Sequence, residues 1–223
     1  MPQFNYNTGE IIAKIVYYGP AFGGKTTSLQ WLHHKFDPLK TRNLFSLDTE
    51  GDRTLFFDLL PMDFGKIDWM TLHIKIYTVP GEVKYNATRK MVLTGADAVI
   101  FVADSEIARH QENLNSLKNL AQNLSLKGMN IRTIPLVFQY NKRDLAHVLP
   151  LDILDQKLNF RNLPSCGSIA IDPYDFGVLE SFIMVLHTMI ESFGQKYNLA
   201  KLGDLDQIIR KLEEQIREKT GFR

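Results

Sequence analysis

One segment sets the architecture expected for this chain: Gly19-Pro20-Ala21-Phe22-Gly23-Gly24-Lys25-Thr26. It fits the pattern G-x-x-x-x-G-K-[ST], which requires a strand before it and a helix after it. An apolar, β-branched run over residues 11–18 leads into the segment, and a helical pattern over residues 25–36 leads out of it. A glycine-rich turn that binds nothing is the alternative, and the flanking pattern disfavours it. We therefore predict a phosphate-binding loop, or P-loop, at residues 19–26.

The chemistry of a polyphosphate explains why these residue types are needed. Glycines permit the turn and let backbone N–H groups approach phosphate oxygens, and the N-terminus of the helix adds partial positive charge. Lys25 supplies a point charge to the β- and γ-phosphates, and the Thr26 hydroxyl can bind Mg²⁺. The predicted phosphate-binding residues are Gly19, Ala21, Phe22, Gly23, Gly24, Lys25, Thr26 and Thr27.

A second segment, Asn141-Lys142-Arg143-Asp144, follows an apolar run over residues 135–140. The Asp144 carboxylate can accept hydrogen bonds from N1–H and the exocyclic amine of guanine, a donor pair that adenine lacks. Asn141 can hold the loop or contact N7, and the stem of Lys142 can cover the base. A polar turn is the default interpretation, but the P-loop upstream favours a guanine site. The predicted ligands are GTP and GDP with Mg²⁺; an ATP-using enzyme is the alternative if Asp144 does not read the base.

Around these segments, short β-rich runs alternate with longer helical patterns, which is typical of an α/β fold with a mostly parallel sheet. Strands are also predicted at residues 66–69, 72–79, 98–103 and, weakly, 168–171, and helices at residues 107–126 and 178–193. The expected fold is a P-loop GTPase, or G domain. It has a mostly parallel central sheet with helices on both faces and one antiparallel edge hairpin, formed by residues 66–79.

The C-terminal part has a separate pattern after a polar-leaning break at residues 195–203. Asp204 and Gln207 fit a capping box, and an apolar stripe follows, formed by Leu205, Ile209, Leu212 and Ile216. We predict a G domain at residues 1–195 and an extension at residues 196–223 that carries an extra C-terminal amphipathic helix. Two roles stay open for this helix: packing on the domain, or docking a partner.

The composition of the chain indicates which classes of partner and which cellular compartment to expect. The chain has 223 residues, 44% hydrophobic, 23% charged, with a net charge of +1, which is ordinary for a globular protein and indicates no nucleic-acid partner. Its single cysteine, Cys166, allows no internal disulfide and fits a reducing compartment. Neither a signal peptide nor a lipidation motif is visible. We expect a cytoplasmic protein without a direct membrane anchor.

Four segments together resemble the MglA family, which comprises bacterial Ras-like GTPases that control cell polarity and motility. They read Lys-Ile-Val-Tyr-Tyr-Gly-Pro at 14–20, Asp-Thr-Glu-Gly-Asp-Arg-Thr-Leu-Phe-Phe-Asp at 48–58, Tyr-Thr-Val-Pro-Gly-Glu at 77–82 and Gln-Tyr-Asn-Lys-Arg-Asp-Leu at 139–145. The segments around Arg53 and Pro80 are not general GTPase signatures. The resemblance spans about residues 4–193 and leaves out the C-terminal helix.

The resemblance implies roles at matching positions. Thr54 is similar to the threonine that meets Mg²⁺ and the γ-phosphate, so Thr26 and Thr54 are the expected metal ligands. Arg53 resembles an intrinsic arginine that stabilises transition-state charge in cis. The Gly81 amide would approach the γ-phosphate, and the Ala170 amide would touch the guanine carbonyl. Arg53, Thr54 and Glu82 are thus the expected catalytic residues.

Two residues depart from the family pattern. Glu82 stands where the family has a glutamine that orients water, and Ala21 stands where glycine is usual. At an effective dielectric of about 20, like charges ~5 Å apart cost roughly 3 kcal/mol, or about two decades in rate. A nearby Lys84 could reduce this cost. Slow hydrolysis and tolerated variation are both open.

Two functions follow from these observations. One is a hydrolysing GTPase switch, slow without an activating partner, which for this family is a roadblock-fold MglB dimer. The alternative is a GTP-loaded scaffold with little hydrolysis, favoured by Glu82 and Ala21. The sequence names neither the effector nor the exchange factor, and the role in polarity rests on the resemblance.

Overall fold

The computed structural model describes residues 2–5, 7–37, 39, 45–49, 52–59, 66–67, 70–197 and 205–222. Its strands are β1 (Gln3–Asn5), β2 (Glu10–Tyr18), β3 (Phe45–Thr49), β4 (Asp52–Leu59), β5 (Lys66–Ile67), β6 (Met70–Thr78), β7 (Ala98–Asp104), β8 (Leu136–Asn141) and β9 (Ser165–Ser168). Its α-helices are α1 (Lys25–Phe36), α2 (Asn86–Leu93), α3 (His110–Ser125), α4 (Leu151–Leu158), α5 (Gly177–Tyr197) and α6 (Leu205–Thr220).

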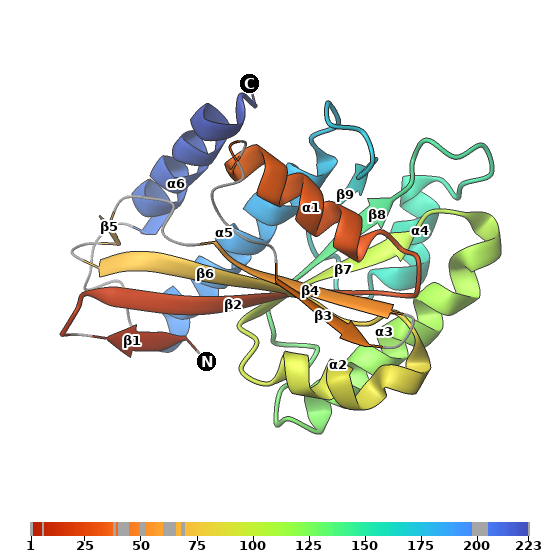
Figure 1. The fold of residues 1–223 in the computed structure, drawn as a ribbon, viewed down its shortest axis with the longest axis horizontal. Coiled ribbons are helices and arrows are strands. Elements are labelled where there is room, and N and C mark those ends of the chain that lie inside the picture. The colour runs from red at the N-terminus through yellow and green to blue at the C-terminus, as the bar shows by residue number, and fades with distance from the viewer. Residues whose placement is uncertain are drawn as a thin grey trace.

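All described strands belong to one sheet with the order β3-β4-β6-β2-β7-β8-β9, in which β1 also pairs with β2 and β5 with β6 (Figure 1). The pairs from β6 through β2, β7 and β8 to β9 are parallel. The predicted hairpin is confirmed as the antiparallel pair β5–β6, with residues 68 and 69 outside the described residues. Its strand β6 lies inside the sheet, between β4 and β2, and not at the predicted edge. At the sheet edge, β3 and β4 add an antiparallel pair that the sequence analysis missed.

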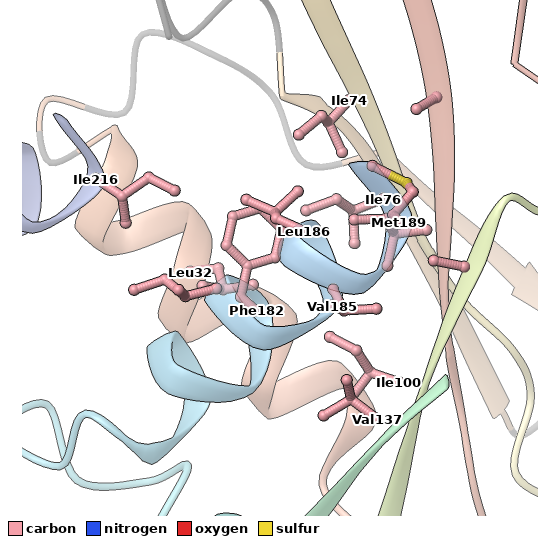
Figure 2. Packing of buried hydrophobic residues seen from close by; sticks show 14 of the residues in the cluster. Leu32, Ile74, Ile76, Ile100, Val137, Phe182, Val185, Leu186, Met189 and Ile216 are labelled. Atoms are coloured by element: carbon pink, nitrogen blue, oxygen red, sulfur yellow. The ribbon is translucent and has the colours of Figure 1, made fainter. Parts of the chain in front are cut away.

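Helices cover both faces of the sheet, as predicted. Along β2, Ile11, Ala13, Ile15 and Tyr17 pack in one core with residues of α1, α5 and α6. Val16 and Tyr18, which point to the opposite face, pack with residues of α2, α3 and α4. Figure 2 shows the first core, which includes Leu32 of α1, Phe182 and Leu186 of α5 and Ile216 of α6.

The last strand lies three residues earlier in the chain than predicted. Residues 168–171 were expected to form the last strand, but β9 ends at Ser168. Backbone hydrogen bonding explains the difference: the Ile169 amide donates to the Asp175 carboxylate at 2.8 Å and the Ala170 amide donates to Asn141 Oδ1 at 3.0 Å. Because these amides are bound to side chains, they do not extend the ladder with β8.

The C-terminal helix packs on the domain. Its apolar stripe, Ile209, Leu212 and Ile216, is buried in the core shared with α1 and α5. Asp204, the predicted N-cap, lies outside the described residues. The helix α5 continues to Tyr197, into the break predicted at residues 195–203. Of the two roles left open for α6, the structure therefore shows packing on the domain.

Candidate functional site

The predicted P-loop connects β2 to α1 at the carboxyl edge of the sheet. Lys25 is buried, and its Nζ donates to the carbonyl oxygens of Pro20 at 2.6 Å and Gly19 at 3.2 Å. Thr26 and Thr27, in the first turn of α1, are half-buried. The first turn of a helix leaves N–H groups without helical acceptors, so the start of α1 offers both donors and partial positive charge to an anion.

Gly24 and Phe22 of the P-loop take left-handed backbone conformations. Gly24 has φ +97°, and a Cβ there would lie 2.0 Å from Asn141 Nδ2, so close approach requires glycine at this position. Phe22 has φ +61° and is 80% exposed. An aromatic side chain therefore stands at the tip of the loop, held in a conformation that residues with a Cβ adopt only at a cost.

Asn141 joins three loops. It is 2% exposed, and its Nδ2 donates to the Gly23 carbonyl at 3.0 Å. Its Oδ1 accepts hydrogen bonds from the Ser168 hydroxyl and the Ala170 amide, each at 3.0 Å. The structure thus brings the P-loop, the Asn141–Asp144 segment and the loop after β9 together through one amide side chain.

A second buried side-chain amide, that of Gln139, stabilises residues next to this junction. Gln139 is fully buried in β8. Its Nε2 donates to the hydroxyls of Ser28 and Ser168, each at 2.9 Å, and its Oε1 accepts from Ser181 at 3.0 Å. The sequence analysis missed Gln139, although a polar residue inside the apolar run 135–140 was a usable signal.

Lys142 and Asp144 differ in their surroundings. Lys142 has φ +67°, and its Nζ lies 2.6 Å from a carboxylate oxygen of Asp104, whose side chain is 0% exposed. Asp144 is exposed, and no hydrogen bond or ion pair of its carboxylate is found within the part of the chain that the structure describes. The sequence analysis overlooked Asp104, which directly follows the apolar run 98–103 at the carboxyl edge, where ligands bind in such sheets.

Gly81 packs directly on the P-loop, because a Cβ built on it would lie 2.4 Å from the Cα of Ala21. Arg89 of α2 holds this segment from the other side. Its Nε donates to the Pro80 carbonyl at 2.8 Å, its Nη2 donates to the Gly81 carbonyl, and its Nη1 donates to Asn119 Oδ1 at 2.8 Å. In a trans peptide the C=O and the following N–H point in opposite directions. Arg89 therefore orients the Gly81 N–H away from itself.

Arg89 is 1% exposed, yet within the described residues no carboxylate forms an ion pair with it. Its guanidinium carbon lies 5.4 Å from the centre of the Tyr18 ring. The Tyr18 hydroxyl donates to Asn119 Oδ1 at 2.6 Å and accepts from Asn123 at 3.0 Å, and burial raises the pKa of Tyr18. Carbonyls, amides and an aromatic face thus stabilise the charge.

Charged residues line a cavity of about 350 Å³ that is bordered by the P-loop, the segment after Gly81 and the start of α3. Lys84 Nζ lies 2.7 Å from a carboxylate oxygen of Glu82, and the hydrogen bond with Glu82 raises the pKa of Lys84. Arg109 donates to the Ala21 carbonyl at 3.2 Å and forms an ion pair with Glu112 at 2.9 Å. The negative charge of Glu82 is therefore offset locally, as the sequence analysis allowed.

The expected catalytic residues Arg53 and Thr54 lie in β4, where their backbones pair with Asp48 and Leu47 of β3. The structure describes their backbone alone. Thr78, at the end of β6, is 1% exposed. The structure therefore gives the strand that carries Arg53 and Thr54, while their side-chain roles stay predictions.

Among the described residues, no group of three or more His, Cys, Asp or Glu side chains could hold a metal ion. A metal here would depend on hydroxyls, phosphates and water, a donor set that suits Mg²⁺. In the same part of the chain, no helix has the length and apolar character needed to cross a membrane.

Comparison with known proteins adds an independent finding. No family model matches the chain. The protein named "Mutual gliding-motility protein MglA" of Myxococcus xanthus (strain DK1622) is 46% identical over 181 residues, which cover 81% of this chain and 92% of that protein. With the α/β sheet, the P-loop and the Asn141–Asp144 segment in place, this similarity shows that the chain belongs to the MglA family of Ras-like small GTPases.

Proposed function

We propose that this protein is a molecular switch that binds GTP and GDP with Mg²⁺ and hydrolyses GTP. The observation that carries the proposal is the junction at Asn141, which ties the P-loop carbonyl of Gly23 to the Ala170 amide. Beside this junction, the exposed Asp144 carboxylate is available to accept from guanine.

The phosphates would lie against the P-loop, with Lys25 and the N-terminus of α1 as their positive partners. On phosphate binding, Lys25 would exchange its carbonyl acceptors for phosphate oxygens. The hydroxyls of Thr26 and Thr54 would hold Mg²⁺, which supplies charge neutralisation between the β- and γ-phosphates. The Gly81 amide, oriented by Arg89, would donate to the γ-phosphate and so report the nucleotide state.

For hydrolysis, Arg53 would stabilise charge on the transferring phosphoryl group, and Glu82 would accept a hydrogen bond from the attacking water. The ion pair between Lys84 and Glu82 supports this role, because it reduces the repulsion between two anions. A GTP-loaded scaffold with little hydrolysis is the second candidate, favoured by the negative charge of Glu82 and by the methyl group of Ala21, which would crowd an incoming arginine. A phosphate-release assay, alone and with an activating partner, separates the two.

The biological setting comes from the family. Because its Myxococcus relative is named as a gliding-motility protein, we propose a role in motility or cell polarity, in the cytoplasm. An MglB-like roadblock-fold dimer is the proposed activator, which would position Arg53 and water. An effector would read the GTP state.

Base recognition provides the sharpest test. We expect the purified protein to bind GDP at least a hundredfold more tightly than ADP. Replacing Asp144 by asparagine removes one acceptor and adds an N–H donor, so Asp144→Asn should lose GDP affinity and gain affinity for xanthosine diphosphate, which carries a carbonyl in place of the amine.

The matched control is Asp152→Asn, at an exposed position in the first turn of α4, which should leave both affinities unchanged. Equal binding of GDP and ADP by the wild-type protein, measured by titration calorimetry, would refute the proposed function.

A further inference from the structure

The loop between β9 and α5 carries Ala170 but has little packing of its own. Its apolar residues Ile171 and Tyr174 are 74% and 84% exposed. Within the loop, the Asp175 carboxylate accepts from the amides of Ile169 at 2.8 Å and Gly177 at 3.1 Å. These local bonds shape the loop, but they do not attach it to the rest of the domain.

Besides the hydrogen bond from the Ala170 amide to Asn141 Oδ1, attachment comes from α1. The indole N–H of Trp31 donates to the Asp172 carbonyl at 2.9 Å, and Trp31 is 7% exposed. The Trp31 ring also meets Phe176, at the end of the loop, edge to face with ring centres 5.8 Å apart. Lys35 Nζ lies 4.9 Å from the Phe176 ring centre. One side chain of α1 therefore contacts the loop on both sides of its exposed tip.

The end of the C-terminal helix completes this contact. The Phe222 ring lies 4.7 Å from the Phe176 ring, centre to centre. Phe222 is itself held by its amide, which donates to the Arg217 carbonyl at 3.0 Å, and by the Arg217 guanidinium 4.3 Å from its ring centre. In Figure 1 the C-terminal end of α6 lies beside α1. Phe176 is thus enclosed between Trp31 and Phe222.

We propose that Phe222 and Trp31 are positioning residues of the guanine site: by fixing Phe176 and Asp172, they hold the loop that presents the Ala170 amide and so slow the release of bound nucleotide. This inference rests on the proposed function. Ala170 is only two positions from Asp172 along the chain, and its amide already lies within the Asn141 junction. In the structure this amide donates to Asn141 Oδ1, and on nucleotide binding it would turn to, or be shared with, the guanine carbonyl. A loop released from α1 and α6 would no longer hold the amide where it can make that hydrogen bond.

The position of these contacts predicts a distinctive kinetic pattern. Trp31 and Phe222 act on the base end of the site, whereas GDP and GTP differ at the phosphate end. Loosening the loop should therefore accelerate the release of both nucleotides by the same factor. The rate at which bound GTP is hydrolysed in a single turnover should not change, because the residues proposed for hydrolysis lie on β4 and after β6.

The experiment measures dissociation of fluorescent GDP and of a fluorescent, non-hydrolysable GTP analogue from the full-length protein, chased by excess unlabelled nucleotide. We expect Phe222→Ala to release both about three- to tenfold faster, as loss of one aromatic pair implies. Phe222→Tyr keeps the ring and should restore the wild-type rate. Trp31→Phe keeps an aromatic residue but loses the N–H donor to Asp172, and should also accelerate release.

Ile208→Ala is the matched control. Ile208 is partly buried against the same core, but it lies at the other end of α6, roughly 20 Å from Phe222 along the chain. It should lower the melting temperature without accelerating release. Unchanged release from Phe222→Ala, in a protein that retains GDP, would overturn this inference and leave the proposed function standing. A wild-type protein that retains no guanine nucleotide would instead refute the proposed function itself.

Discussion

Asn141 and Gly24 have to be considered as a pair. A side chain at position 24 would meet Asn141 Nδ2 at 2.0 Å, while that same nitrogen donates to the neighbouring Gly23 carbonyl. Gly24 therefore serves two purposes. It lets phosphate approach the loop, and it leaves room for the Asn141 side-chain amide to reach the Gly23 carbonyl. At this position the phosphate and base halves of the site depend on the same few atoms.

Substitution of Glu82 should directly change the rate of GTP hydrolysis. Replacing it by glutamine removes one negative charge near the γ-phosphate, and we expect Glu82→Gln to raise single-turnover GTP hydrolysis by roughly tenfold. Lys84→Met should slow hydrolysis in the wild-type background, because it removes the cation 2.7 Å from Glu82.

The comparison requires a charge-matched control, for which Glu214→Gln on the exposed face of α6 is suitable. It should leave the rate unchanged. If Glu82→Gln hydrolyses GTP no faster than this control, the charge of Glu82 does not limit hydrolysis.

Cys166 predicts a pH dependence of stability. Burial raises the pKa of the Cys166 thiol to about 12, from an ordinary value of 9.0, and its Sγ donates to the Gly177 carbonyl at 3.3 Å. The folded thiol keeps its proton above pH 9, whereas the unfolded chain loses it. Stability from this group is therefore complete below pH 9 and declines between pH 9 and 12, by about 1.4 kcal/mol per pH unit.

Urea unfolding at pH 8 and pH 10 tests this expectation. The free energy of unfolding of the wild-type protein is compared with that of Cys166→Ala at each pH, because the contributions of other titrating groups cancel in the difference. At pH 8 the native thiol should also react slowly with alkylating reagents. A stability difference that does not vary with pH would contradict the expectation.

At the scale of elements, Arg89 couples α2 to the end of β6. Lysine at this position keeps the charge but replaces a planar fork by a single ammonium group, which cannot reach the Pro80 and Gly81 carbonyls and Asn119 together. We expect Arg89→Lys to lower the free energy of unfolding by about 1–3 kcal/mol and to slow GTP hydrolysis, because the Gly81 amide loses its orientation. Urea titration and single-turnover assays measure the two effects.

Arg132→Lys, at an exposed position, is the control and should change stability by less than about 0.5 kcal/mol. Wild-type stability and hydrolysis in Arg89→Lys would show that the fork is dispensable.

Elements with a strong local pattern were predictable, and those shaped by distant partners were not. The bounds predicted for α1, residues 25–36, agree with the structure, because the P-loop fixes its start. The last strand was misplaced, because the Ile169 and Ala170 amides donate hydrogen bonds to the side chains of Asp175 and Asn141. Such contacts leave no periodic pattern in the sequence. A lone Arg89 in a short helix likewise gave no signal, because two of its three acceptors are backbone carbonyls and the third, Asn119, lies 30 positions away in the sequence.

For the molecule as a whole, the structure brings together the two segments on which the predicted nucleotide site depends. The P-loop and the Asn141–Asp144 segment lie together as expected, because both follow strands of one parallel sheet and so meet at its carboxyl edge. The sequence left the role of α6 open, because this helix could either pack on the G domain or dock a partner. Burial of Ile209, Leu212 and Ile216 decides for packing, and makes the extension part of the folded unit.

A folded unit of this kind should respond to its ligand globally. A ligand that binds the native state alone adds RT ln(1 + [L]/Kd) to stability, about 2.7 kcal/mol at a hundredfold excess over Kd. For a chain of this size that is roughly 5–10 °C in melting temperature. We expect GDP with Mg²⁺ to produce this shift, ADP to produce little, and EDTA to remove part of the GDP shift. Differential scanning fluorimetry measures all three, with Lys25→Ala as the variant in which GDP should no longer protect. Equal protection by GDP and ADP would show that Asp144 does not read the base, and full protection of Lys25→Ala would place the nucleotide outside the P-loop.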